Sequence, residues 1–185
     1  MARTKRCCER LDLTRSYNTH FCSAVNACAR IHSFALATTP HFGSMIGKRQ
    51  EVLAADDLVA LAIHARRLIE NTVGKEHANG IKLNCVGHKA RLEPVSVWRI
   101  VNVIIHHRDI NIFRSRPKQR TGSIEDYLEE NQVSVYPSCI VTSDEGKTIG
   151  FRIGDLTTVF ESHILDPIIE LCSDHRLYLD DDIWG

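Results

Sequence analysis

The amino-acid sequence predicts a mainly α-helical fold, a small helical bundle with a short β-hairpin before its C-terminal helix. Three observations support this prediction. Apolar residues recur every three or four positions in several long segments, two β-rich runs flank a turn-forming stretch late in the chain, and 43% of the 185 residues are apolar while 25% are charged. An α+β fold is the alternative, because the sequence also predicts a small sheet of two or three strands late in the chain. As a separate alternative, the apolar run 100–105 could form a buried strand instead of a helix.

The first 44 residues form a basic segment that we expect to be largely helical. Residues 1–50 contain eight lysines and arginines but only two acidic residues, Glu9 and Asp12. Apolar side chains follow a helical repeat over 7–38, and Pro40 and Gly43 end that repeat. We expect residues 45–185 to form the main helical domain, and the whole chain to fold as a single domain.

The most regular helical stripe covers residues 50–73 and ends before Gly74. A connector with a short strand at 81–86 follows it. A third helix is predicted over 95–107, with Pro94 at its entrance. Its sequence, VSVWRIVNVIIHH, is rich in β-branched residues of modest helix propensity, so burial must stabilise it.

Residues 114–123 are expected to form a basic loop, and Ser123 caps a short helix after it. A hairpin is predicted over about 133–154, with its turn at the stretch SDEGK. We expect Asp155 to cap a last helix, 156–172, and Pro167 to kink it.

Composition also bears on location. No apolar run approaches the ~18 residues that a membrane span requires. The seven cysteines are an odd number and include no C-x-x-C pair, which favours reduced thiols in the cytoplasm over a secreted disulfide framework.

Arg99, Asn102 and His106 are the main candidates for catalytic residues. Residues three and seven positions apart lie near one face of a helix, so these three side chains share a polar stripe. Arg99 and His106 are about 10 Å apart along the axis at ~1.5 Å per residue, so both can reach one small anion. An imidazole can take and return a proton near neutral pH, whereas a guanidinium pairs with phosphate oxygens. His107 adjoins the stripe and is the fourth candidate.

A basic run begins directly after these histidines. Such side chains can neutralise phosphates and so provide affinity for RNA without reading its sequence. The alternative interpretation is a solvated loop, and the net charge of zero argues against a protein that coats nucleic acid. The candidate RNA-binding residues are Arg108, Arg114, Arg116, Lys118 and Arg120.

The segment RIVNVIIH, from Arg99 to His106, resembles the arginine–histidine motif of the HEPN superfamily (higher eukaryotes and prokaryotes nucleotide-binding). The resemblance extends loosely over residues 10–113. It implies a small helical bundle, metal-independent cleavage of RNA, and a homodimer that pools two motifs in one cleft. Arg99 would then bind phosphate, and His106 would act as acid and base. In our own hypothesis Asn102 has an orienting role beside these two residues. Ile100 departs from the pattern, because many members have a polar residue directly after the arginine.

Two other classes of protein stay open. A non-catalytic interaction protein, such as an antitoxin-like or regulatory module, would pack the polar stripe against another chain. A metalloprotein would need ligands such as the pairs Cys22 with Cys28 or Cys85 with His88. Adjacent residues diverge by ~100° on a helix, so His106 and His107 cannot both face one ion. We predict no metal and no cofactor, and we place His64 and His163 at the edge of the core.

Overall fold

The computed structural model describes residues 2–36, 45–87, 91–113 and 137–174. Its fold is mixed α+β, with long helices packed beside a five-stranded antiparallel sheet. The prediction of a mainly helical bundle with a short hairpin is therefore wrong, because the sheet has more strands than expected. The α+β alternative is confirmed. The predicted basic loop at 114–123 and the short helix after Ser123 lie outside the described residues.

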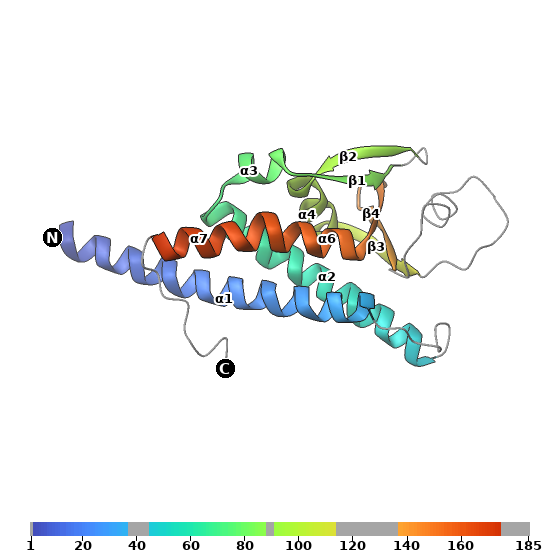
Figure 1. The fold of residues 1–185 in the computed structure, drawn as a ribbon, viewed down its shortest axis with the longest axis horizontal. Coiled ribbons are helices and arrows are strands. Elements are labelled where there is room, and N and C mark those ends of the chain that lie inside the picture. The colour runs from blue at the N-terminus through green and yellow to red at the C-terminus, as the bar shows by residue number, and fades with distance from the viewer. Residues whose placement is uncertain (1, 37–44, 88–90, 114–136, 175–185) are drawn as a thin grey trace.

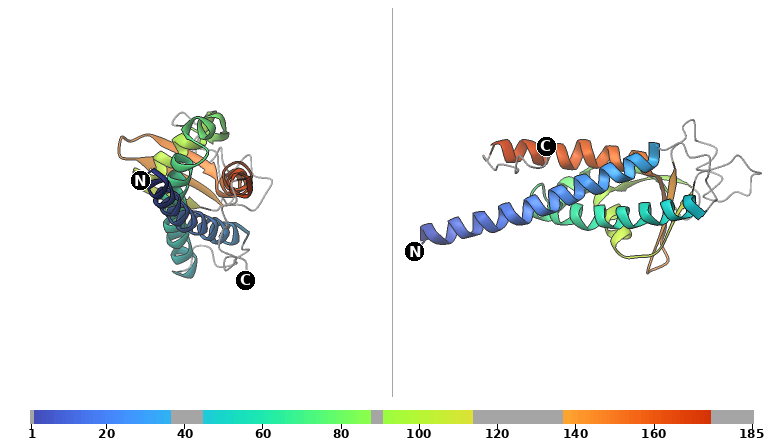
Figure 2. Two further views of the ribbon diagram at one scale, coloured as in Figure 1. Left: turned by 90° about the vertical axis from the view of Figure 1, so that its left-hand side faces the viewer. Right: turned by 90° about the horizontal axis from the view of Figure 1, so that it is seen from below.

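Three helical rods run along the long axis of the molecule (Figure 1). They are α1 (Ala2–Leu36), α2 (Met45–Asn71) and a C-terminal rod made of α6 (Ile153–Phe160), the π-helical turn η1 (Glu161–Leu165) and α7 (Asp166–Asp174). The helices predicted over 7–38, 50–73 and 156–172 are confirmed. The first turns of α1 extend past the other elements (Figure 2).

The core lies where these rods meet the sheet. Phe21, Ala24 and Ile31 of α1 are completely buried in the same apolar cluster as Leu58 of α2 and Phe160 of α6. The N-terminal basic segment and the main domain therefore share one core. Among the residues that the structure describes, no helix is both long and apolar enough to cross a membrane.

The sheet has the strand order β2-β1-β5-β4-β3. Its strands are β1 (Lys82–Val86), β2 (Leu92–Ser96), β3 (His107–Phe113), β4 (Ser138–Ser143) and β5 (Thr148–Arg152). The strand predicted at 81–86 and the hairpin around SDEGK are confirmed as β1 and as β4–β5. Gly146 adopts φ +76° in that hairpin turn, a conformation that glycine reaches without steric cost.

The third predicted helix is shorter than expected. It is α4 (Val97–Ile105), and it joins β2 to β3, the two opposite edges of the sheet; the short helix α3 (Lys75–Gly80) packs beside it. The strand alternative for 100–105 is wrong. Pro94 does not open the helix but lies in β2, because an edge strand tolerates a residue without an N–H donor. His107 is not helical either, since it begins β3.

The C-terminal rod departs from expectation at its N-cap, and it contains an irregular turn close to Pro167. Arg152, not Asp155, is the N-cap residue of α6, and no side chain caps it; Asp155 lies in the first turn. A π-helical turn, η1, ends at Leu165, two residues before Pro167. Pro167 has no N–H to donate to the carbonyl oxygen of His163. The His77 Nε2 atom of α3 lies 3.0 Å from that oxygen and can donate to it, so this irregular turn is also where α3 contacts the rod.

Two histidines link α1 to α2. The Nδ1 atoms of His20 and His64 are 2.9 Å apart, so one ring must donate a proton and the other must accept it through a lone pair. Partial burial lowers the pKa of His20, and the charge of Arg67 lowers it further. Burial also lowers the pKa of His64, with a smaller contribution from His20. The pair is therefore compatible with at most one added proton.

We predict that the free energy of unfolding decreases as the pH falls below about 6.5, the ordinary pKa of histidine. Because the folded-state pKa values are lowered, the unfolded chain binds more protons in this range, and stability is lost as the pH falls. Urea unfolding between pH 7.5 and pH 5 measures the effect. His64→Gln should flatten the dependence, whereas the control His32→Gln, at an exposed residue of α1, should leave it unchanged. Equal slopes for all three proteins would contradict this account.

Candidate functional site

Arg99, Asn102 and His106 line one open cavity of about 560 Å³. The cavity lies between α4 and the β4–β5 turn. Trp98 and Val103 of α4 complete one wall, and the opposite wall is formed by Ser143, Asp144, Glu145 and Lys147. The three residues of the predicted polar stripe thus face a common space.

Local hydrogen bonds at both ends of α4 position this stripe. Ser96 is the N-cap residue, and its hydroxyl accepts from the Arg99 backbone N–H at 3.2 Å. His106 is the C-cap residue; its N–H donates to the Asn102 carbonyl, and its own carbonyl accepts from the Asp144 N–H, both at 3.0 Å. The second of these bonds ties the end of α4 directly to the opposite wall of the cavity.

The side chains of Arg99 and His106 are free to meet a ligand. Both residues are exposed, and neither side chain has an ion pair or hydrogen bond with any residue that the structure describes. The opposite face of α4 is buried, with Ile100, Val101 and Ile104 at most 1% exposed. The helix is therefore fixed from inside while its polar stripe stays open to solvent.

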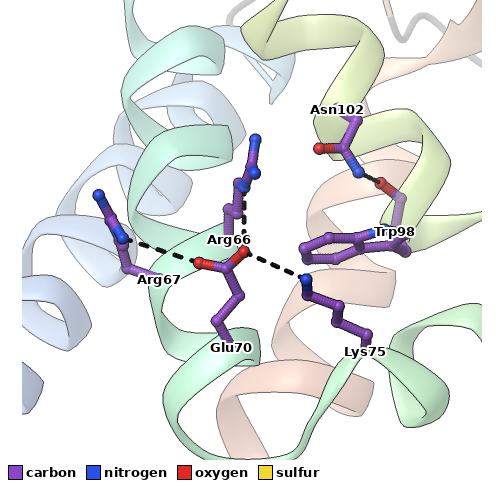
Figure 3. Close-up of polar contacts among 6 residues, drawn as sticks. All are labelled: Arg66, Arg67, Glu70, Lys75, Trp98 and Asn102. Atoms are coloured by element: carbon purple, nitrogen blue, oxygen red, sulfur yellow. Dashed lines mark hydrogen bonds and ion pairs between the residues drawn. The ribbon is translucent and has the colours of Figure 1, made fainter.

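Asn102 differs from its two neighbours on the stripe. Its side-chain amide nitrogen donates to the Trp98 carbonyl oxygen at 2.7 Å (Figure 3). The amide is thus held by its own helix, while its oxygen atom and its second N–H have no hydrogen-bond partner among the described residues.

His107 and Arg108 are not part of this cavity. They line a different groove of about 430 Å³ between β3 and α2, together with Val52 and other residues of α2. The His107 Nδ1 atom lies 2.8 Å from the carbonyl oxygen of Ile104, so the ring caps the end of α4. The structure therefore brings together three of the four predicted catalytic residues. The other predicted RNA-binding residues, Arg114, Arg116, Lys118 and Arg120, lie outside the described residues.

The cavity has mixed charge rather than a uniformly basic lining. Arg99 and Lys147 are balanced by Asp144 and Glu145. Lys147 forms an ion pair with Glu145 at 2.5 Å, and this hydrogen-bonded contact lowers the pKa of the Glu145 carboxyl. Glu145 is thereby a poor proton carrier near neutral pH. Arg99 is the cation of this cavity that has no partner among the described residues.

A cation–aromatic cluster adjoins the cavity at Trp98 (Figure 3). The guanidinium carbon of Arg66 is 5.6 Å from the centre of a Trp98 ring, and the Lys75 ammonium is 5.2 Å from it. Glu70 contacts three cations, Arg66 at 3.3 Å and Arg67 and Lys75 at 3.8 Å each. We name these five residues the Trp98 cluster. No local sequence pattern relates its members, because they come from three elements, α2, α3 and α4.

The pairs weighed as metal ligands are Cys22 with Cys28 and Cys85 with His88. Cys28 and Cys85 are buried, and burial raises the pKa of their thiols to about 11 and about 12. His88 lies outside the described residues. No group of three or more His, Cys, Asp or Glu side chains in the described part of the chain is arranged to hold a metal ion.

Comparison with protein-family models, with curated proteins and with solved structures finds no match to this chain. The resemblance to the HEPN superfamily thus stays a hypothesis carried by the spacing of Arg99 and His106.

We predict that Ser96→Ala lowers the free energy of unfolding by about 1 kcal/mol, because the Arg99 N–H loses its cap. Chemical denaturation measures this change. Ser96→Asp should retain most of the stability, since a carboxylate also caps a helix N-terminus. Equal stability of the alanine variant and the unchanged protein would show that the cap does not hold α4 in place.

Proposed function

We propose that this protein binds RNA at the Arg99–His106 cavity and cleaves it there without a metal ion. The observation that carries the proposal is that a guanidinium and an imidazole, both without partners among the described residues, line one solvent-open cavity. An uncommitted guanidinium favours a phosphate group, with which it forms paired hydrogen bonds. The imidazole supplies the proton transfer that phosphodiester cleavage needs.

The reaction balances with these two groups. His106 takes the proton from a ribose 2′-hydroxyl, and the 2′-oxygen forms a bond to the adjacent phosphorus. The bond from phosphorus to the 5′-oxygen breaks, and that oxygen receives the proton back from His106. The products are a 2′,3′-cyclic phosphate and a 5′-hydroxyl. Arg99 contacts the phosphoryl oxygens, where negative charge increases in the transition state.

We expect His106→Ala and Arg99→Ala each to lower the rate of RNA cleavage at least ~100-fold while the protein stays folded. Gel analysis of a labelled single-stranded RNA, with and without EDTA, measures the rate. EDTA should not change it. His107→Ala is the discriminating variant: His107 lines another groove, so cleavage should persist. Full activity in either the His106 or the Arg99 variant would remove the assignment.

A non-catalytic interaction module is the second candidate, and the edge strand β3 favours it. In the hairpin, the Ser143 N–H donates to the Lys147 carbonyl oxygen, on the β5 side of β4. The backbone groups of the preceding residue, Thr142, therefore point to the other side, toward β3, where Thr142 pairs with Asp109. Hydrogen-bonding direction alternates along an antiparallel strand, so Ile110 and Ile112 point their backbone groups away from β4. No described strand pairs with that edge. Val52 of α2 lines the groove beside it and is 49% exposed.

We propose that a second copy of the chain pairs with this edge, in keeping with the predicted homodimer. With Ile110 opposite Ile110 of the other copy, Asp109 of each chain lies opposite Asn111. Asn111→Asp then places two carboxylates opposite each other, whereas Asn111→Lys places opposite charges together. We predict weaker self-association for the first variant and tighter self-association for the second, measured by sedimentation. Shifts in the same direction, or a monomer throughout, would exclude this interface.

A further inference from the structure

The Trp98 cluster contains more cationic side chains than are needed to neutralise its single carboxylate. Three cations, Arg66, Arg67 and Lys75, surround a single carboxylate, Glu70. One pairing would neutralise Glu70, so two positive charges are left over. Lys75 lies over a ring of Trp98, which also lines the Arg99–His106 cavity, whereas Arg67 lies on the other side of Glu70 from Trp98 (Figure 3).

The three cations are not held equally. Arg66 lies closest to Glu70, at 3.3 Å, and its side chain is 33% exposed. Arg67 and Lys75 are farther away, at 3.8 Å, and are 63% and 58% exposed. Exposed ion pairs of this kind contribute little to stability because water screens them. Arg66 is thus the structural partner of Glu70, and Arg67 and Lys75 can turn to another anion at small cost.

From this difference, and on the basis of the proposed function, we infer that the Trp98 cluster is a second contact site for single-stranded RNA. Arg67 and Lys75 bind backbone phosphates of the strand whose scissile phosphate lies at Arg99. When Lys75 moves from the ring to a phosphate, a nucleobase takes its place on Trp98. This exchange is favourable because base–aromatic stacking is stronger than an exposed cation–π contact.

The chemistry favours a single strand over a duplex. Bases of a duplex are stacked on one another and cannot reach an aromatic side chain, whereas an unpaired base can. The Trp98 cluster contributes cations and one ring but no set of donors and acceptors that would select a base. We therefore expect affinity without sequence preference.

The test is the salt dependence of RNA binding. Fluorescence anisotropy of a labelled oligouridylate of about twelve nucleotides is measured over a range of KCl concentrations. Each phosphate contact to a single strand contributes about 0.7 to the slope of log affinity against log salt. The double variant Arg67→Gln/Lys75→Gln should lower the magnitude of that slope by about 1.4, and should weaken binding about tenfold at ~0.1 M salt.

Lys48→Gln is the matched control. Lys48 is an exposed cation on the same helix as Arg67, nineteen positions away and therefore about 28 Å distant along the axis. It should leave the slope unchanged. An unchanged slope in the double variant, or an equal loss in the Lys48 variant, would overturn the inference.

A second measurement tests the base contact. The chain has two tryptophans, so Trp184→Phe leaves Trp98 as the sole fluorescent tryptophan. Oligouridylate should quench Trp98 emission, whereas inorganic polyphosphate, which carries charge but no base, should not. Absence of quenching with bound RNA would exclude stacking on Trp98.

The binding measurements test the second contact site independently of the proposed cleavage activity. At saturating RNA the double variant should cleave at the unchanged rate, because Arg67 and Lys75 do not touch the reacting atoms. A reduced slope in a protein that cleaves nothing would support the binding site and reject the nuclease. Arg99-dependent cleavage, together with an unchanged salt slope in the double variant, would support the nuclease and reject the second contact site.

Discussion

The burial of one face of α4 is the constraint on which the rest of the structure depends. Ile100, Val101 and Ile104 are almost completely enclosed, and their burial offsets the modest helix propensity of a β-branched sequence. Because this face is fixed inside, the stripe that carries Arg99 and His106 must face outward. The same helix spans the distance between β2 and β3, so it positions the two edges of the sheet together with the cavity.

Much of the fold could be predicted from local patterns, and the failures have local causes. The stripes of α1, α2 and the C-terminal rod and the turn at SDEGK give strong signals. The strand β2 was missed because Pro94 is equally typical of a helix's first turn. The strand β3 was missed because the helical pattern was extended through His107. Ile110 and Ile112 alternate with Asp109 and Asn111 there, which is the strand signal that could have been found.

The candidate site was predictable only along one element. Helical geometry alone places Arg99, Asn102 and His106 on one face, and the cavity contains all three. The opposite wall, from Ser143 to Lys147, and the Trp98 cluster come from distant parts of the chain, and no local pattern relates them. The hydrogen bond that holds Asn102 to the Trp98 carbonyl is likewise a property of the folded helix.

The order of the strands also determines when the sheet can form during synthesis. The central strand β5 pairs with β1 and β4, and Val86 of β1 lies opposite Gly150. Chains elongate at about 5–20 residues per second, so β5 leaves the ribosome roughly three to thirteen seconds after β1. Until β5 emerges, no strand joins the β1–β2 pair to the half of the sheet that contains β3 and β4. The nascent chain must keep these edges apart from other chains, and the last strand to emerge is the one that completes the sheet.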